Sequence, residues 1–233
     1  MKNFLMIIVM MMFTRHIVAQ DTNETNDSDN GIRLGLTLSP QLAWLNGGDK
    51  NLQSNGTYLG FSYGLLMDIV FKTNYAFSTG IIVSYDGGKL TYSESSKFNT
   101  YGEQTFLPST NVDYRTQYLQ IPLTMKLRTN QIGYITYFGQ FGLQGGIRIR
   151  SRADISSSNT PLAEDKVDFS KDVTLPDLGL LIGGGFEYAL TGNTALTTSL
   201  QFYNGFLDTT DNPEGYKSKS TLNHLRLQLG FYF

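Results

Sequence analysis

The stretch LNHLRLQLGFYF, residues 222–233, points most directly to the fold. From Leu225 to Phe233 every second residue is apolar, and mostly polar residues or glycine stand between them. A period of two is typical of a β-strand with one apolar face. Such a strand at a chain end would leave an exposed edge that invites aggregation, whereas pairing with the first strand of a barrel removes that edge. The stretch therefore predicts a barrel that this strand closes.

A final alternating strand that ends on phenylalanine also resembles the closing strand of bacterial outer-membrane β-barrels. In those proteins the barrel assembly machinery reads this segment. The resemblance implies that the assembly machinery is a partner of this chain. The residues that would carry the closing-strand signal are Leu229, Phe231 and Phe233.

The composition favours many strands and tight turns. Of the 233 residues only 16% are charged, 13% are aromatic and 24 are glycine. After residue 20 no run reaches the ~18 apolar residues of a membrane helix, so a membrane location would depend on alternating strands. The net charge of −2 gives no basic field for nucleic acid. The absence of cysteine excludes disulfides, thiol catalysis, thiolate metal sites and a lipid-modified N-terminal cysteine.

The N-terminal region predicts export from the cytoplasm. Residues 1–19 have a positive start at Lys2, an apolar core over 4–13 and a small residue, Ala19, which together indicate a secretory signal peptide. Ile17 is larger than usual before a cleavage site, which leaves the cleavage position open. Residues 20–31 are polar and acidic and predict a disordered leader. Residues 32–233 are predicted to form one β-barrel domain.

Alternation and turn signals divide that domain into about eight strands. These cover residues 32–42, 58–72, 75–85, 118–128, 133–150, 178–190, 194–206 and 222–233. Short turns around Thr73, Asn130 and Gly192 alternate with long polar loops over residues 46–56, 86–116, 151–174 and 204–221. Short periplasmic turns and long outer loops are typical of outer-membrane barrels. The predicted fold is therefore all-β, an eight-stranded antiparallel transmembrane up-and-down β-barrel preceded by a signal peptide.

The two faces of the strands distinguish a membrane barrel from a soluble one. One face of every strand is apolar, rich in aromatic residues and almost free of charge, while the other carries glycine, serine, threonine, glutamine and a few charges. Small polar residues suit a narrow polar lumen, and the apolar face then contacts lipid. Arg148 and Arg150 are assigned to the inward face by the same alternation. We expect a paired charge network in the lumen, formed by Arg33, Asp68, Lys126, Glu187 and Arg226.

Several segments resemble the PorT-like outer-membrane β-barrel family of Bacteroidetes. They are YLQIPLTMKL at 118–127, GLTLSPQLAWL at 35–45, the hairpin at 60–90, LGLLIGGGFEYAL at 178–190 and the phenylalanine-terminated last strand. The resemblance spans roughly the whole mature chain. It implies an eight-stranded outer-membrane barrel, and one member of the family is linked to the type IX secretion system. Pro122 within a strand predicts a bulge or a locally unpaired position, because proline cannot donate to the ladder.

Few residues suggest catalysis or cofactor binding. His224 is the one histidine of the mature chain and is predicted to be structural, inside the lumen or at its rim. Gly183-Gly184-Gly185 lacks the following Lys-Ser/Thr of a phosphate loop and predicts close strand approach instead. The acidic residues of loop 151–174 lack calcium-loop spacing. We therefore expect no metal and no cofactor. Aromatic residues of loop 86–116 either contact a partner or pack on each other: Tyr92, Phe98, Tyr101, Phe106 and Tyr114.

The sequence thus predicts a non-enzymatic protein of the cell outer membrane. Outer-membrane lipid surrounds it, the long surface loops are free for an envelope protein partner, and nucleic acid is not a partner. Three alternatives stay open: a lipid-modifying barrel enzyme that uses His224, a small pore, and a soluble extracytoplasmic barrel.

Overall fold

The computed structural model describes residues 31–157, 160–192, 194–216 and 218–233. The predicted signal peptide and all of the predicted leader except Gly31 lie outside these residues. Within them no helix is long and apolar enough to cross a membrane. The elements are β1 (Gly31–Gly47), β2 (Leu52–Lys72), β3 (Tyr75–Tyr92), β4 (Ser96–Lys97), η1 (Asn99–Tyr101), β5 (Thr105–Phe106), β6 (Thr110–Arg128), β7 (Ile135–Ser157), β8 (Thr160–Asp168), β9 (Pro176–Ala189), β10 (Ala195–Gly205) and β11 (Ser220–Tyr232).

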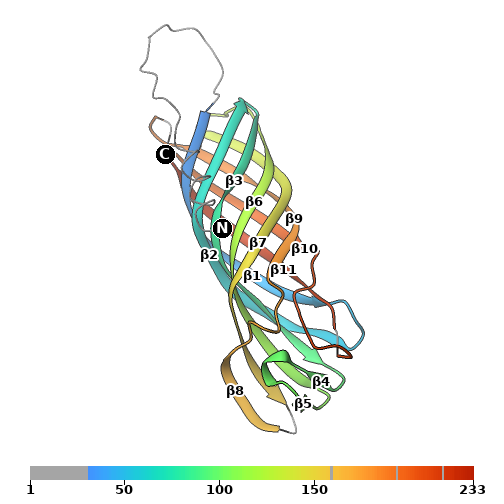
Figure 1. Ribbon diagram of the computed structural model, residues 1–233. Coiled ribbons are helices and arrows are strands. Elements are labelled where there is room, and N and C mark those ends of the chain that lie inside the picture. The colour runs from blue at the N-terminus through green and yellow to red at the C-terminus, as the bar shows by residue number, and fades with distance from the viewer. Residues whose placement is uncertain (1–30, 158–159, 193, 217) are drawn as a thin grey trace, which may run out of the picture.

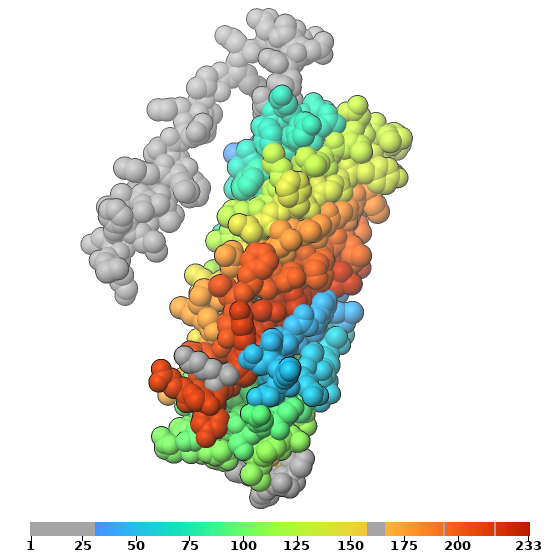
Figure 2. All heavy atoms as spheres, turned by 90° about the vertical axis from the view of Figure 1, so that its right-hand side faces the viewer, coloured from blue at the N-terminus to red at the C-terminus, as the bar shows by residue number. Residues whose placement is uncertain are grey.

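Eight antiparallel strands form a closed ring. Their order is β6-β3-β2-β1-β11-β10-β9-β7, and β7 pairs back onto β6, while β8 extends the sheet beyond the ring on β7. β1 and β11 pair from Gly35 with Tyr232 to Gly47 with Ser220, so the predicted closing strand closes the barrel. The ring is seen as a tilted cylinder in Figure 1, and Figure 2 shows the blue N-terminal strands beside the red C-terminal segment on its surface.

The alternation of the sequence explains which side chains point outward. Along β1, for example, Leu34, Leu36 and Leu38 are exposed while Thr37 and Ser39 are buried. The same inside-out pattern, polar within and apolar without, runs round the ring and is the pattern of a barrel that lipid surrounds. The predicted faces are therefore confirmed on most strands.

Three of the four predicted long loops are largely strand, whereas residues 206–219 of the predicted loop 204–221 do connect β10 to β11. β3 continues to Tyr92 and β6 begins at Thr110, so only residues 93–109 of the predicted loop 86–116 lie between these two strands. β1 and β2 leave only residues 48–51 between them. The boundaries predicted for the loops 46–56, 86–116 and 151–174 were therefore wrong, because polar side chains at these positions continue the hydrogen-bonded ladder beyond the apolar region. The strand extensions, β4, β5 and β8 lie at the lower end of the molecule in Figure 1, away from the C-terminus.

A bulge changes the alternation near residue 150. β6 and β7 pair Tyr118 with Arg148 but Gln117 with Arg150, so β7 holds one extra residue. From this point outward-facing residues of β7 are even-numbered, and Arg150 is exposed. The inward placement predicted for Arg150 was wrong, because simple alternation does not include the bulge.

Glycine and proline have separate roles in the ring. A Cβ on Gly185 would lie 2.0 Å from the Thr198 carbonyl oxygen, so close strand approach requires this glycine, as predicted for the triglycine segment. Pro122 lies in a gap of the β3–β6 ladder, between the pairs Thr79–Leu123 and Ile82–Gln120, and the register is the same on both sides. Of the two alternatives for Pro122, the structure shows the locally unpaired position on the β3 side, while Pro122 stays paired with Gln144 of β7.

Candidate functional site in the lumen and at the loop end

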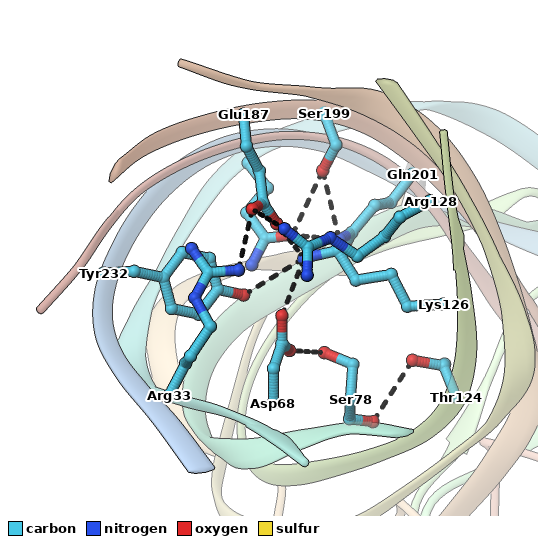
Figure 3. A network of polar contacts seen from close by, with 11 residues as sticks. Arg33, Asp68, Ser78, Thr124, Lys126, Arg128, Glu187, Ser199, Gln201 and Tyr232 are labelled. Atoms are coloured by element: carbon cyan, nitrogen blue, oxygen red, sulfur yellow. Dashed lines mark hydrogen bonds and ion pairs between the residues drawn. The ribbon is translucent and has the colours of Figure 1, made fainter. Parts of the chain in front are cut away.

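A charged cluster fills the barrel near the short-turn end (Figure 3). At its centre the Lys126 ammonium donates to Asp68 at 2.8 Å and to Glu187 at 2.5 Å. Lys126 comes from β6, Asp68 from β2 and Glu187 from β9, so one side chain connects three strands. All three residues are at most 3% exposed. A lysine in this setting stays charged only because two carboxylates compensate for its lost hydration.

Further cations complete this turn-end cluster. Arg33 donates to Glu187 at 2.8 Å, and Arg128 lies 3.4 Å from the same carboxylate. The Arg33 guanidinium also stacks over the Tyr232 ring at 4.5 Å. Together with Lys126, three cations therefore share two carboxylates, and the network joins strands from every side of the ring. Removing one member would leave a buried charge without its partner.

A second cluster surrounds Arg226, farther towards the loop end. Its guanidinium donates to Gln41 at 2.8 Å, to Gln120 at 2.8 Å and to Ser84 at 3.3 Å. Asp86 accepts hydrogen bonds from Gln41 and Ser84, at 2.5 and 2.7 Å. Arg226 is 1% exposed and Asp86 0%, so this mid-barrel cluster is also fully enclosed.

His224 belongs to the mid-barrel cluster. It is 0% exposed, its Nδ1 lies 3.3 Å from Asp86 Oδ1, and its ring stacks on Tyr203 with centroids 4.8 Å apart. A catalytic histidine must reach a substrate atom, and this ring faces no open surface. The predicted position inside the barrel is confirmed.

The space between the two clusters is nearly filled. A cavity of about 10 Å³ remains there, lined by residues that include Lys126, Gln140, Gln201 and Arg226. A single buried water needs ~10–15 Å³. The described side chains that line this cavity therefore leave room for about one water molecule between the two clusters.

The five residues predicted for the lumen thus all point inside, but they form two groups. Arg33, Asp68, Lys126 and Glu187 meet in the turn-end cluster, whereas Arg226 belongs to the mid-barrel cluster. Sequence reasoning missed Asp86, because it was assigned to a loop. Continuing the alternation of β3 past Tyr85 would have placed it inside. Of the predicted closing-strand residues, Leu229, Phe231 and Phe233 are exposed on the outer surface.

The loop end has an apolar core of its own, which we call the loop cap. Phe98 is 0% exposed and its ring contacts Phe106 at 5.3 Å and Phe169 at 5.2 Å between centroids. Tyr92 and Tyr114 share a hydrogen bond of 2.7 Å between their hydroxyl groups. The aromatic residues of this loop therefore pack on each other, which is the second of the two alternatives that the sequence left open.

Asp172 holds the loop cap together. Its carboxylate accepts hydrogen bonds from the backbone amides of Asn99 and Thr100 and from the Thr100 hydroxyl. This fixes η1 against the segment between β8 and β9. Burial raises the pKa of Asp172 above its ordinary value, and the hydrogen bonds from Thr100 and Asn99 oppose that shift.

The residues that the structure describes contain no group of three or more metal-ligating side chains. The arrangement consists of charges paired inside a closed barrel and a packed cap above it. Such a site holds strands and loops in place.

Comparison with known proteins identifies the family. Residues 18–233 match the model of the outer membrane protein β-barrel domain. The chain belongs to this family. It is therefore an outer-membrane β-barrel protein, and the predicted location in the cell outer membrane is confirmed. The comparison with curated proteins gave no match.

Several solved structures are similar in fold. Neisserial surface protein A is 12% identical, with 86% of this chain and 95% of that chain covered and a TM-score of 0.47. The outer membrane protein AlkL is 12% identical, with coverages of 93% and 97% and a TM-score of 0.43. Ail, the attachment invasion locus protein of Yersinia pestis, is 15% identical, with coverages of 87% and 97% and a TM-score of 0.35. At these identities the likeness concerns the fold alone.

Proposed function

We propose that the protein is a non-enzymatic, non-conducting barrel that holds an ordered loop cap at the outer surface for an envelope protein partner. The filled lumen carries this proposal. Between the turn-end and mid-barrel clusters only about 10 Å³ is free, which is too little for a hydrated ion to pass. His224 is buried and faces no open surface, which argues against a lipid-modifying enzyme that uses this histidine.

The loop end supports the binding part of the proposal. Its loops are packed around Phe98 and Phe169 and fixed by Asp172, so a partner would meet a preformed surface and would pay little ordering entropy. A hollow of about 570 Å³ lies beside the cap and is lined by residues that include Glu94, Ser96 and Tyr216. Leu107, which is 42% exposed, directly precedes Pro108, which lines this hollow.

The resemblance to PorT-like proteins adds a more specific proposal. A partner in the secretion or envelope machinery fits that resemblance, which rests on the residues quoted above. Recognition of Leu229, Phe231 and Phe233 by the barrel assembly machinery also stays a prediction. Both concern partners, and both need experiments in cells.

Site-specific photo-crosslinking in intact cells tests the partner. A crosslinking amino acid at Leu107 or Glu103 in the loop cap should give a discrete protein adduct, whereas the same residue at outward-facing Leu200 in β10 should not. Identification of the adduct names the partner. Equal adduct patterns at the cap positions and at Leu200 would contradict a binding role for the cap.

A further inference from the structure

The outer wall of β6 and β7 carries a group of cations that the lumen network does not involve. The bulge turns Arg150 and Arg152 to the outside of β7, and Arg115 lies opposite Arg152 in the β6–β7 register. Lys166, at the end of β8, lies beside them and is exposed. These four residues, Arg115, Arg150, Arg152 and Lys166, are called the basic wall.

The basic wall borders a hollow. The hollow has a volume of about 320 Å³, and Tyr58 and Tyr85 line its other side. Asp86 also borders it, but the Asp86 carboxylate already accepts hydrogen bonds from Gln41 and Ser84 in the lumen. The hollow is therefore positive, partly aromatic, and large enough for a small anionic group.

The charges of the basic wall are only partly compensated. Asp154 pairs with Arg115 and accepts a hydrogen bond of 2.6 Å from the Lys166 backbone amide. Asp168 lies close enough to Arg150 that this cation contributes to lowering the pKa of Asp168, after the hydrogen bonds from Ser170. Among the side chains that the structure describes, neither Arg150 nor Arg152 forms an ion pair.

The pairing of Arg115 with Arg152 is itself unusual. Like charges directly opposite each other on one face of a sheet are destabilising. An anion between the two guanidinium groups removes this repulsion and can accept paired hydrogen bonds from each. Asp168 lies opposite Arg152 on β8 and Asp154 pairs with Arg115, so a bound anion would add to a compensation that is only partial.

The height of the basic wall in the membrane indicates which anion it meets. Leu119 and Ile121 on β6, and Ile147 and Ile149 on β7, face outward directly below it and are exposed. These apolar residues contact the acyl chains, so the next residues along the same strands lie at the level of the lipid headgroups. Basic residues at that level attract anionic headgroups.

We propose that the basic wall binds the phosphate of a phosphorylated lipid in the outer leaflet, with the acyl chains of that lipid against the apolar face of β6 and β7. Arg150 and Arg152, which form no ion pair with the side chains that the structure describes, supply charge, Arg115 and Lys166 are positioned by Asp154, and Tyr85 lies at the edge of the hollow. The site would fix one lipid to one side of the barrel. It goes beyond the proposed role of the loop cap and uses different residues.

Lipid binding by the full-length protein tests this proposal. Wild-type protein, the variant R150S/R152S and the control K50S/K72S are titrated in neutral detergent micelles with bisphosphorylated lipid A, and bound lipid is counted by native mass spectrometry. Lys50 and Lys72 are exposed cations outside the hollow, so the control removes the same charge. Each lost charged contact should weaken binding about tenfold. The control should bind as the wild type does.

Two further arms identify the source of the phosphate. Lipid A without its phosphates should bind at least tenfold more weakly to the wild type, and inorganic phosphate alone should not compete at equal concentration. Equal binding of phosphorylated and dephosphorylated lipid would overturn the proposal, as would equal binding by R150S/R152S and the control. Competition by inorganic phosphate would assign the site to soluble anions and so contradict a lipid ligand.

Folding of the variants is checked by their heat-modifiable migration in gels. If R150S/R152S does not fold, R150K/R152K keeps both charges and loses the planar forks of arginine. We expect this variant to bind phosphorylated lipid A with intermediate affinity. Wild-type affinity in R150K/R152K would contradict recognition by the arginine forks.

Discussion

Arg226 on β11 donates a 2.8 Å hydrogen bond to Gln120 on β6, and these two strands lie on opposite sides of the ring. One pair of side chains therefore spans the whole lumen. In the turn-end cluster Lys126 likewise connects β6 to β2 and β9. The barrel is thus held together from inside by polar contacts between strands that share no backbone ladder.

The first prediction concerns the centre of the turn-end cluster. Lys126→Met leaves Asp68 and Glu187 buried beside fewer cations and should lower the free energy of unfolding by about 3–5 kcal/mol. Lys89→Met removes a lysine that is paired with Asp113 on the exposed outer surface, and should cost less than about 1 kcal/mol. Urea unfolding in lipid vesicles measures both. Similar losses for the two variants would show that the cluster adds no special stability.

A compensating variant separates charge from packing. D68N/K126M removes Asp68 together with the lysine and keeps Glu187 paired with Arg33 and Arg128, so the carboxylate that K126M leaves without a cation is gone. It should regain part of the stability that K126M loses, because neutral amides are cheaper to bury than unpaired carboxylates. If D68N/K126M is no more stable than K126M, the loss in K126M reflects packing.

Two glycines of β7 test close strand approach. A Cβ on Gly142 would lie 2.2 Å from the Leu123 carbonyl oxygen, whereas Gly145 has no atom within 4 Å of that position. Gly142→Ala should therefore reduce the fraction that shows heat-modifiable migration, and Gly145→Ala should leave it unchanged. Both substitutions add the same methyl group to the same strand, which makes them a matched pair. Equal folded fractions would contradict the steric argument.

The loop cap should be separable from the barrel. Phe169 is 0% exposed among the rings of the cap, so Phe169→Ala should cost on the order of 3–5 kcal/mol locally. We expect faster proteolysis within residues 93–109 while the barrel keeps its heat-modifiable migration. The control Leu107→Ala changes an exposed side chain and should leave the proteolysis rate as it is. Unfolding of the barrel by F169A would mean that cap and barrel form one cooperative unit.

Asp172 should make the cap sensitive to pH. Its folded pKa is raised, so the folded cap binds the proton more tightly than the unfolded cap does. The stability that this proton gives to the folded cap is fully present below the ordinary aspartate pKa of 3.8, and it is lost as the pH rises through the folded pKa. Hydrogen exchange of residues 99–101, corrected for intrinsic rates, should therefore speed up with rising pH in the wild type. In D172N this component should be absent, and an unchanged pH profile would refute the assignment.

Alternation predicted much of this structure. The eight strands, their outward leucines and the inward positions of Asp68, Lys126, Glu187 and Arg226 follow from a period of two and need no long-range information. The predictions that failed concern features that depend on contacts between residues distant in the sequence. Arg150 was placed inside because a bulge opposite Gln117 cannot be read from alternation. Asp86 was assigned to a loop because the ladder continues there without apolar residues.

The sequence could not predict which charged residues pair with each other, for a related reason. Alternation gives the side of the wall but not the height of a residue in the barrel, which depends on the stagger between strands. Arg226 and Lys126 share the inward side, yet they belong to different clusters because their strands are offset. The packing of the loop cap likewise joins Phe98 to Phe169 across two loops, a contact that no local pattern encodes.

Single-channel recording shows whether side chains close the lumen of this barrel. Purified wild-type protein in planar lipid bilayers should give no stepwise conductance above the bilayer background. The variant K126A/R226A, which shortens the central side chain of each cluster, should give small discrete steps if it inserts. Stable, reproducible steps from the wild type at neutral pH would mean that the lumen is open.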